Sequence, residues 1–371
     1  MDVVVTGIGL ISALGHLEQT WTGLVEGRSG IRLCQPFSHL KPHPLALIEA
    51  YPTDFLSLTE RVLHDALHDA NLEPPFPECG VVIGSSRGNQ AQWEKLTTNP
   101  ENLCGWLNTL PNAAAIAVAQ HIQTQAMVFA PMAACATGLW AIVRAAELVR
   151  RGEVERAIAG AVEAPITPLT LIGFERMGAL ARTGAYPFGR DREGLVLGEG
   201  GAIFVLESAD VAKQRGAQVY GQVLGFGLTA DGYHVSAPEP GCGSAIAAVQ
   251  QCLTRSGLAP QDIDYIHAHG TATQLNDQNE AHLIQKLFSP QICVSSTKGS
   301  TGHTLGASGA LGAAFCLMAL RHQVLPPNVG LKQTDFNLAF VRNAQTAQVR
   351  NVLCLSFGFG GQNAAIAFQA I

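Results

Sequence analysis

The chain has 371 residues, of which 47% are hydrophobic and only 14% are charged, against about 25% charged residues in an average globular protein. This composition excludes a disordered chain, a coiled coil and a charge-rich fibrous protein. The net charge of −6 and the lack of a basic run exclude the electrostatic signature of a nucleic-acid-binding protein. A chain of this length forms two domain-sized halves or one large core.

Short β-rich runs alternate with helical stretches along the chain, which is typical of an α/β fold with buried sheets. Strands are predicted at residues 3–6, 81–83, 127–130, 157–161, 202–206, 219–224, 263–268, 292–295, 352–356 and 364–368. Helices are predicted at residues 18–26, 58–70, 139–150, 244–255, 277–287 and 310–321. Most of the strands are apolar throughout, so we expect both faces of each sheet to be covered.

The polar segment 207–216 (ESADVAKQRG) is the predicted boundary between two halves, residues 1–212 and 213–371. Residues 127–151 have the pattern of a strand, a turn of small residues and a helix, and residues 292–321 repeat this order. We therefore expect an internal duplication of the fold.

The sequence predicts neither a membrane span nor an oxidising compartment. The N-terminal segment lacks the basic region of a signal peptide, and the nine cysteines are scattered without CxxC spacing. The apolar stretches 126–143 and 301–320 contain Pro131 and four glycines, respectively, so a buried strand–turn–helix explains each better than a membrane span. We expect a cytoplasmic protein with no disulfide or zinc framework.

Two short motifs suggest cofactor or metal binding, and both have simpler explanations. Gly7 and Gly9 follow a strand, but Ser12 stands where a dinucleotide-binding fingerprint needs its third glycine. His64 and His68 are four residues apart on a predicted helix, but no third metal ligand is near them in the sequence. We expect a tight turn and an ordinary amphipathic helix.

Residues 84–88 (GSSRG) match the GxSxG elbow of serine hydrolases, with Ser86 as the nucleophile. Asn89 and Gln90 are a weak start for the helix that such an elbow needs. A hydrolase that uses Ser86 is kept as an alternative.

Cys135 is the strongest candidate nucleophile. It lies in AACATG (residues 133–138), between a predicted strand and a predicted helix. This placement puts the sulfur at a helix N-terminus, where partial positive charge stabilises a thiolate. The small neighbours leave room for a substrate, although a buried structural cysteine fits the same pattern.

Two histidines strengthen this interpretation. His269 opens HGTAT after a predicted strand, and His303 lies in KGSTGHTLGA (residues 298–307), between a strand and a helix. In a duplicated fold, Cys135 and the His303 loop occupy equivalent places and meet between the halves. The glycine turn FGFGGQN (residues 357–363) brings backbone N–H groups close to a ligand.

With these motifs the sequence resembles the β-ketoacyl-acyl-carrier-protein synthases of the thiolase superfamily, in their elongating Cys-His-His type, which includes type II polyketide ketosynthases. The resemblance covers the whole chain and implies an α/β, thiolase-like fold of five layers. Two αβαβα halves would form it, with the nucleophile in residues 1–212 and the two histidine loops in residues 213–371. The other matching segments are residues 3–9, 29–31, 191–192, 198–200, 269–280, 298–309 and 356–363, with Trp21.

The resemblance implies a decarboxylative Claisen condensation in fatty acid or type II polyketide biosynthesis. Cys135 would take an acyl group from an acyl-carrier thioester. His269 and His303 would contact the malonyl thioester carbonyl, promote loss of CO₂ and stabilise the enolate, while Lys298 orients the site. The substrates would be carried on the phosphopantetheine of acyl carrier protein, so no metal or other cofactor is expected.

The resemblance also assigns supporting roles. The backbone N–H groups of Cys135 and Phe359 would form an oxyanion hole, with the Phe359 ring acting as a gate. Asp277 and Glu280 would support the His269 loop. The hydroxyls expected to bond the pantetheine arm are those of Thr271 and Thr273.

Several positions depart from the family pattern. Ala272 gives HGTAT instead of HGTGT, Gln362 stands where Thr is commoner, and His267 stands where Asn or Glu is usual. The chain is also shorter than typical members between residues 30 and 81 and before Cys135. These regions shape the acyl pocket and the dimer contacts.

A non-catalytic partner subunit resembling a chain-length factor is the main alternative, because such subunits pair with an active synthase. They usually lack the nucleophile, whereas this chain keeps it. A Cys-His-Asn initiating synthase or a Cys-His-Cys thiolase fits less well, since two histidine loops are present. The resemblance implies a homodimer or a heterodimer, and Arg144, Arg150 and Arg151 are candidates for docking the carrier protein.

Overall fold

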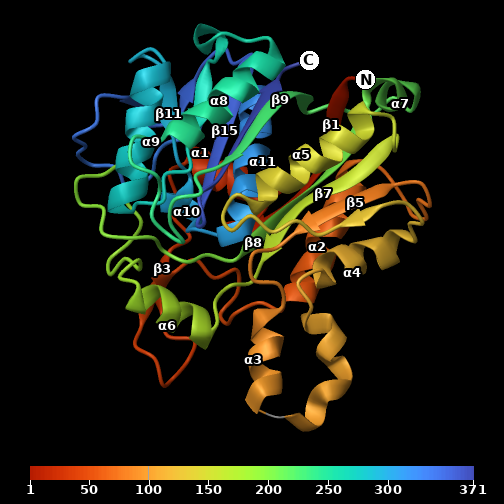
Figure 1. Ribbon diagram of the computed structural model, residues 1–371, viewed down its shortest axis with the longest axis horizontal. Coiled ribbons are helices and arrows are strands. Elements are labelled where there is room, and N and C mark those ends of the chain that lie inside the picture. Colours follow the sequence, from red (N-terminus) through yellow and green to blue (C-terminus); the bar gives the residue numbers. More distant parts are fainter. Residues whose placement is uncertain (99) are drawn as a thin grey trace.

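Two copies of one strand pattern make up the protein in the computed structural model, which describes residues 1–98 and 100–371 (Figure 1). The first copy has the spatial order β6-β5-β7-β8-β1, and the second has the order β11-β10-β15-β16-β9. Numbered within each copy, the two orders are the same, which confirms the predicted duplication. The first five strands are β1 (Val3–Ser12), β5 (Gly80–Gly84), β6 (Val128–Phe129), β7 (Arg156–Glu163) and β8 (Gly200–Ser208). The second five are β9 (Gly221–Ala230), β10 (Tyr265–His267), β11 (Cys293–Ser295), β15 (Asn351–Gly358) and β16 (Gln362–Gln369).

The two sheets enclose a central layer of two helices. Among the described residues the two sheets form one continuous sheet, joined where β1 pairs with β9 through Val4 with Gln222 and Val5 with Gly221. Helix α5 (Thr137–Arg150) packs on β7 and on β16, and α11 (Ser308–His322) packs on β15 and on β8, so each helix touches both sheets.

Four further helices cover the outer faces of the sheets. Helices α2 (Phe55–Asp69) and α4 (Ala113–Ile122) share an apolar cluster with the first sheet. Helices α8 (Gly243–Ser256) and α9 (Gln274–Leu287) share another with the second sheet. The result is the five-layered αβαβα arrangement that the sequence predicts, with α5 and α11 in the middle (Figure 1).

The central helices touch at their N-terminal ends through glycine. A Cβ atom on Gly138 would lie 2.5 Å from the backbone nitrogen of Ala310, and one on Gly309 would lie 3.0 Å from that of Leu139. Any larger residue would separate the helices. The segment Leu305–His322 is long and apolar enough to cross a membrane, but 89% of it is buried inside the protein. It is therefore a core helix, as the sequence predicts.

The remaining elements connect these layers, and several were not predicted. Helix α3 (Gln90–Thr98) follows the GSSRG motif, although the sequence there is a weak helix start, and it projects from the body together with η1 (Pro100–Thr109) (Figure 1). The polar boundary segment contains helix α7. The remaining helices are α1 (Leu17–Val25), α3 (Gln90–Thr98), η1 (Pro100–Thr109), α6 (Pro168–Arg176), α7 (Ala209–Gln214), η2 (Pro260–Asp262), α10 (Lys298–Thr301) and η3 (Leu305–Ala307). The short strands are β2 (Gly15–His16), β3 (Arg32–Cys34), β4 (His43–Leu45), β12 (Val324–Leu325), β13 (Ala339–Phe340) and β14 (Gln345–Thr346).

Candidate active site

Cys135, His269 and His303 converge between the two halves. Cys135 precedes α5, His269 follows β10, and His303 lies between α10 and η3. The Cys135 sulfur and one ring nitrogen from each histidine all lie within 4.8 Å of one another, and all three residues are buried. The two imidazole rings meet edge to face, with centroids 5.3 Å apart. The duplication thus brings together the residues that the sequence singles out.

The turn that carries Cys135 is held rigidly. Ala134 has a φ of 47°, a left-handed conformation that is unfavourable for a residue with a side chain. The hydroxyl of Thr137 accepts a hydrogen bond from the Ala133 N–H at 2.9 Å and donates one to the Ala134 carbonyl at 2.6 Å. The hydroxyl of Ser356 donates to the Cys135 carbonyl at 2.9 Å. These bonds fix the backbone on both sides of the nucleophile.

The Cys135 thiol has a raised pKa, whereas the sequence predicts a stabilised thiolate. Burial raises its pKa to about 11, although the positive charge of Lys298 and a hydrogen bond from the Phe359 backbone N–H each lower it in part. The predicted stabilisation of a thiolate at the helix N-terminus is therefore outweighed by loss of hydration. The Phe359 backbone N–H thus lies beside the nucleophilic sulfur, and its role in an oxyanion hole stays a prediction.

His269 is positioned through its backbone, and its ring is left free. The N–H groups of His269 and Gly270 donate to the two carboxyl oxygens of Glu280 at 2.6 and 2.7 Å. The Lys298 amine donates to the His269 carbonyl. The buried ring nitrogen Nδ1 of His269 has no hydrogen-bond partner among the described residues. Such a group is costly unless a ligand satisfies it.

His303 is held through one ring nitrogen. Its Nδ1 lies 2.7 Å from the Ser308 hydroxyl, so Nε2 is the nitrogen available to a substrate. Burial and, after it, the charge of Lys298 hold the pKa values of both His303 and His269 well below their usual range. Both imidazoles are therefore neutral hydrogen-bonding groups at neutral pH.

The predicted supporting carboxyls lie behind the His269 loop. Asp277 accepts hydrogen bonds from the N–H groups of Phe188 at 2.7 Å and Ala272 at 3.2 Å. Burial raises the pKa of Asp277 to about 6 and that of Glu280 to about 7. Burial also lowers the pKa of Lys298, which Glu280 offsets in part. These groups hold the loop without touching the cleft's reacting atoms.

The three reactive side chains line a cleft of about 310 Å³. Thr271 and Thr273 lie along it, with their hydroxyls 2.8 Å apart. Phe359 is at its wall and stacks on Phe174, with ring centroids 6.1 Å apart. All the predicted site residues therefore lie in or directly behind one cleft.

Sequence reasoning missed a buried carboxyl near the nucleophile. Glu163, at the end of β7, is fully buried and accepts a hydrogen bond from the Ser86 N–H, while its Oε2 has no partner among the described residues. Burial raises its pKa to about 7, and its charge raises the pKa of Cys135. A glutamate at the end of an apolar strand was the available signal.

The competing motifs do not form sites. The Ser86 hydroxyl accepts a bond from the Gly306 N–H at 3.2 Å and contacts no histidine among the described residues. His64 and His68 stack with ring centroids 6.4 Å apart, and neither belongs to a group of metal-ligating side chains in the described part of the chain. The hydrolase alternative therefore has no support in the structure.

The arginines proposed for carrier docking lie on or just after α5 and make contacts within the protein. Arg150 is half-buried and donates to the carbonyls of Val223 and Leu224 at 3.0 and 3.1 Å. It lies at the opposite end of α5 from Cys135, about 20 Å away at a rise of about 1.5 Å per residue. Arg144 and Arg151 both pair with Glu147. None of these contacts tests carrier docking, so the patch stays a prediction.

Sequence comparison matches the chain to two family models. The description "Beta-ketoacyl synthase, N-terminal domain" matches residues 49–212, and "Beta-ketoacyl synthase, C-terminal domain" matches residues 220–332. The chain belongs to the β-ketoacyl synthase family. Membership confirms the family, the fold and the class of condensing acyltransferase that the sequence predicts.

Relatives of this synthase cover its whole length. The chain is 32% identical to "3-oxoacyl-[acyl-carrier-protein] synthase 2" of Coxiella burnetii, over 100% of this chain and 98% of that protein. It is 35% identical to the protein of the same name in a Synechocystis species, over 99% and 97%.

Two solved structures superpose on nearly the whole synthase. One is a type II PKS acyl-carrier protein in complex with its ketosynthase, with a TM-score of 0.94, 26% identity, and coverage of 100% of this chain and 99% of that chain. The other is a ketosynthase in complex with its chain length factor from Xenorhabdus doucetiae, with a TM-score of 0.87, 27% identity, and coverage of 100% and 98%.

Proposed function

We propose that this synthase catalyses the decarboxylative Claisen condensation of an acyl thioester with a malonyl thioester, both carried on acyl carrier protein. The observation that carries this proposal is the convergence of the Cys135 sulfur and the His269 and His303 nitrogens within 4.8 Å. One nucleophile and two neutral imidazoles suit a reaction that first transfers an acyl group and then stabilises an enolate.

In the first step, the Cys135 sulfur attacks the carbonyl of the acyl thioester. The carbonyl oxygen carries the developing negative charge, which the backbone N–H groups of Cys135 and Phe359 stabilise. The thiol proton passes to the departing pantetheine sulfur, so the products are acyl-Cys135 and the free carrier thiol. Burial keeps the resting Cys135 thiol protonated. The proton is therefore transferred during the acylation step itself.

In the second step, the malonyl thioester lies in the cleft with its carbonyl against His269 and His303. The bond to the carboxylate breaks, CO₂ leaves, and the electron pair forms an enolate that the two imidazoles stabilise by hydrogen bonds. The enolate carbon then attacks the acyl-Cys135 carbonyl. The Cys135 sulfur leaves and regains a proton, which releases a β-ketoacyl thioester on the carrier.

The supporting roles follow from position. Lys298 positions His269 by bonding its carbonyl, and its charge adds to burial in keeping both imidazoles neutral. Asp277 and Glu280 position the same loop, while Thr271 and Thr273 bond the pantetheine arm along the cleft. The phosphopantetheine of the carrier is the only prosthetic group that this chemistry requires.

The partners and the cellular setting are part of the proposal. The protein in the similar complexes binds an acyl-carrier protein or a chain length factor, which supports a carrier partner and a dimer with an identical or related subunit. The halves 1–212 and 213–371 would supply the nucleophile and the histidines, respectively. The eight cysteines whose side chains are described are unpaired, which supports a cytoplasmic location.

The alternative of a non-catalytic partner subunit is less well supported. A subunit that only shapes its partner has no need of Cys135, His269 and His303 in contact with one another. The test that separates the two functions is therefore acylation of this chain itself.

Intact-protein mass spectrometry after incubation with acyl-carrier thioesters measures that acylation. We expect one acyl group on the wild-type chain and none on Cys135→Ala, with Cys34→Ala as the control because Cys34 is a more exposed thiol. His269→Ala and His303→Ala should still be acylated but lose about 10²- to 10⁴-fold in condensation with malonyl carrier. If the wild type accepts no acyl group, the condensing function is wrong and the non-catalytic partner subunit is the better-supported function.

A further inference from the structure

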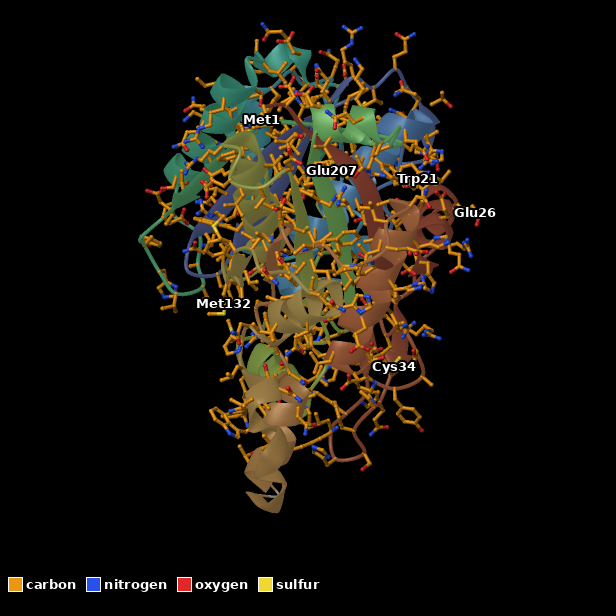
Figure 2. All side chains as sticks on the ribbon, turned by 90° about the vertical axis from the view of Figure 1, so that its right-hand side faces the viewer. Met1, Trp21, Glu26, Cys34, Met132 and Glu207 are labelled. Carbon is orange, nitrogen blue, oxygen red and sulfur yellow. The ribbon has the colours of Figure 1, made fainter. Side chains whose placement is uncertain are left out.

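A short segment of the first half bonds the helix of the second half that carries Lys298. Residues 29–31 form this segment, the strap, between α1 and β3. Glu26 and Cys34, which flank the strap in the chain, lie along one side of the molecule in Figure 2, so the strap runs over the surface. The helix that it bonds, α10, is buried along its whole length. The strap therefore holds an element of the active site from outside.

The first residue of the strap satisfies a carbonyl group of α10. The Ser29 hydroxyl donates to the Gly299 carbonyl at 2.7 Å. In a longer helix, this carbonyl would accept from the N–H group four residues further on. That group belongs to His303, and it donates to the Val196 carbonyl at 2.6 Å instead. Ser29 thus supplies the donor that α10 lacks because it ends at Thr301.

The other two residues of the strap also contact the active-site segments. The Gly30 N–H donates to the Ser300 carbonyl at 2.8 Å, which satisfies a second carbonyl of α10. The Ile31 side chain packs against a small apolar cluster that includes Val196 and Ala272. Val196 holds the backbone of one reactive histidine, and Ala272 belongs to the loop of the other. The strap therefore lies where the segments that carry the lysine and both histidines meet.

A tight backbone contact holds α10 as well. A Cβ atom on Gly299 would lie 2.0 Å from the Val329 carbonyl oxygen, so the two backbones are packed directly against each other. Lys298 is the first residue of α10, and its amine bonds the His269 carbonyl. The contact with Val329 and the bonds to the strap together fix the position of α10, and with it the position of the lysine amine.

We propose that Ser29 is a positioning residue for the condensing reaction, because its hydroxyl holds α10 where the Lys298 amine reaches the His269 carbonyl. The inference rests on the proposed function and adds to it a residue from outside the cleft. Ser29 is not part of the cleft lining, so it acts only through the groups that α10 positions. Small displacements of such groups slow a reaction strongly, by up to about 10²-fold for 1 Å.

The experiment measures the two steps of the reaction separately in Ser29→Ala. Intact-protein mass spectrometry gives the rate of acylation of Cys135, and release of CO₂ from malonyl carrier gives the rate of decarboxylation. We expect decarboxylation to slow about three- to tenfold, the range for loss of one hydrogen bond, with an unchanged KM for malonyl carrier. Acylation should keep its wild-type rate. Ser29→Thr keeps the hydroxyl and should restore decarboxylation.

A double-mutant cycle with Lys298→Met tests whether Ser29 acts through the lysine. In the Lys298→Met background, Ser29→Ala should slow decarboxylation by less than about twofold, because the bond that α10 positions is already lost. Ser289→Ala is the matched control. The Ser289 hydroxyl bonds the Gln291 side chain at 2.6 Å, at the opposite end of α9 from the cleft. This control should leave both steps at their wild-type rates.

Three results would overturn the positioning role of Ser29 and leave the condensing function intact. They are a wild-type rate of decarboxylation in Ser29→Ala, an equal slowing of both steps, and effects of Ser29→Ala and Lys298→Met that multiply independently. An equal slowing of both steps would identify the strap as a contact that only stabilises the fold. If the wild type neither accepts an acyl group nor releases CO₂, the proposed function is wrong, and the positioning role is wrong with it.

Discussion

The Lys298 side chain bonds the backbone carbonyl of His269 and not its imidazole. The lysine thus fixes where the ring stands without occupying either of its nitrogens. Its charge also disfavours protonation of the imidazoles of His269 and His303, in addition to the effect of their burial. One side chain therefore helps to fix the position of His269 and contributes to the neutral state of both imidazoles.

Replacing Lys298 by Met should slow malonyl decarboxylation by about 10²-fold, because the bond that positions His269 is lost and its ring shifts. Acylation of Cys135 should continue, because its backbone donors are unchanged. Without the nearby charge, the pKa values of the imidazoles rise, so the acid limb of the activity profile should move to higher pH. Lys298→Arg is the matched variant, and an acid limb that is the same in Lys298→Met and wild type would contradict the electrostatic role.

The Cys135 thiol should react slowly with iodoacetamide at neutral pH. Its pKa is raised to about 11, so the thiolate fraction and the alkylation rate should keep rising beyond pH 9. Peptide mapping after timed alkylation gives the rate at Cys135 separately from the other cysteines. A plateau reached below pH 8 would show that the helix N-terminus outweighs burial, contrary to this prediction.

The substitution Glu163→Gln should raise the free energy of unfolding relative to the wild type by an amount that increases with pH. The pKa of Glu163 is raised from 4.5 to about 7 by burial, so between these values the folded state binds more protons than the unfolded state. Wild-type stability therefore falls as the pH rises through this window, by about 3 kcal/mol at most from this group.

The variant lacks the titrating group and avoids that loss. Urea unfolding of both proteins between pH 4.5 and 7.5 measures the difference in the free energy of unfolding. A difference that stays constant with pH would show that the carboxyl is not titrating in this range.

Zinc should inhibit the enzyme, and a chelator should not. The Cys135 sulfur and the two imidazole nitrogens lie within 4.8 Å of one another, a donor set that suits Zn²⁺. Since the proposed reaction uses the same atoms, micromolar Zn²⁺ should block acylation, and EDTA should restore it. Loss of activity when EDTA is added to enzyme that has not been exposed to zinc would show instead that the enzyme requires a bound metal.

Two glycine-to-alanine changes should have opposite effects on stability. Gly138→Ala places a Cβ 2.5 Å from the backbone nitrogen of Ala310, so it should destabilise the protein by about 1–3 kcal/mol. Gly173→Ala lies within α6, where a Cβ would meet nothing within 4 Å, and it should stabilise by about 0.5–1 kcal/mol. Thermal unfolding compares the two, and a destabilised Gly173→Ala would count against this packing argument.

Prediction from the sequence worked best for reactive residues that lie next to a recognisable strand or helix. Cys135, His269 and His303 each lie in a loop that follows a predicted strand, so their approximate places followed from topology and a duplicated pattern. The five-layered arrangement was predicted from the resemblance to the β-ketoacyl synthases, whereas the residues alone indicated a duplicated α/β fold. Helices α3 and α6 were missed, since neither has a strong apolar face, and α6 begins at a Thr167–Pro168 start signal that is short and local.

What the sequence could not supply is burial. The raised pKa of the Cys135 thiol depends on how much water the surrounding layers exclude, and no local motif encodes this. The contacts of Arg150 with two carbonyls of β9 join residues more than 70 positions apart. Glu163 lies close to the nucleophile, and Ser29 bonds α10, through segments that are distant in the chain, so their roles became visible only in three dimensions.

The contact of α5 with α11 through glycine has a consequence for how activity responds to small deformations. Cys135 lies just before α5, His303 lies in the segment that leads through η3 into α11, and the two helices belong to different halves. A slight rotation of one half against the other therefore alters the sulfur-to-nitrogen distance while every strand and helix stays intact. Moderate pressure or cosolvent should thus lower turnover well before circular dichroism records any loss of structure. Turnover is therefore more sensitive than circular dichroism to the relative position of the two halves.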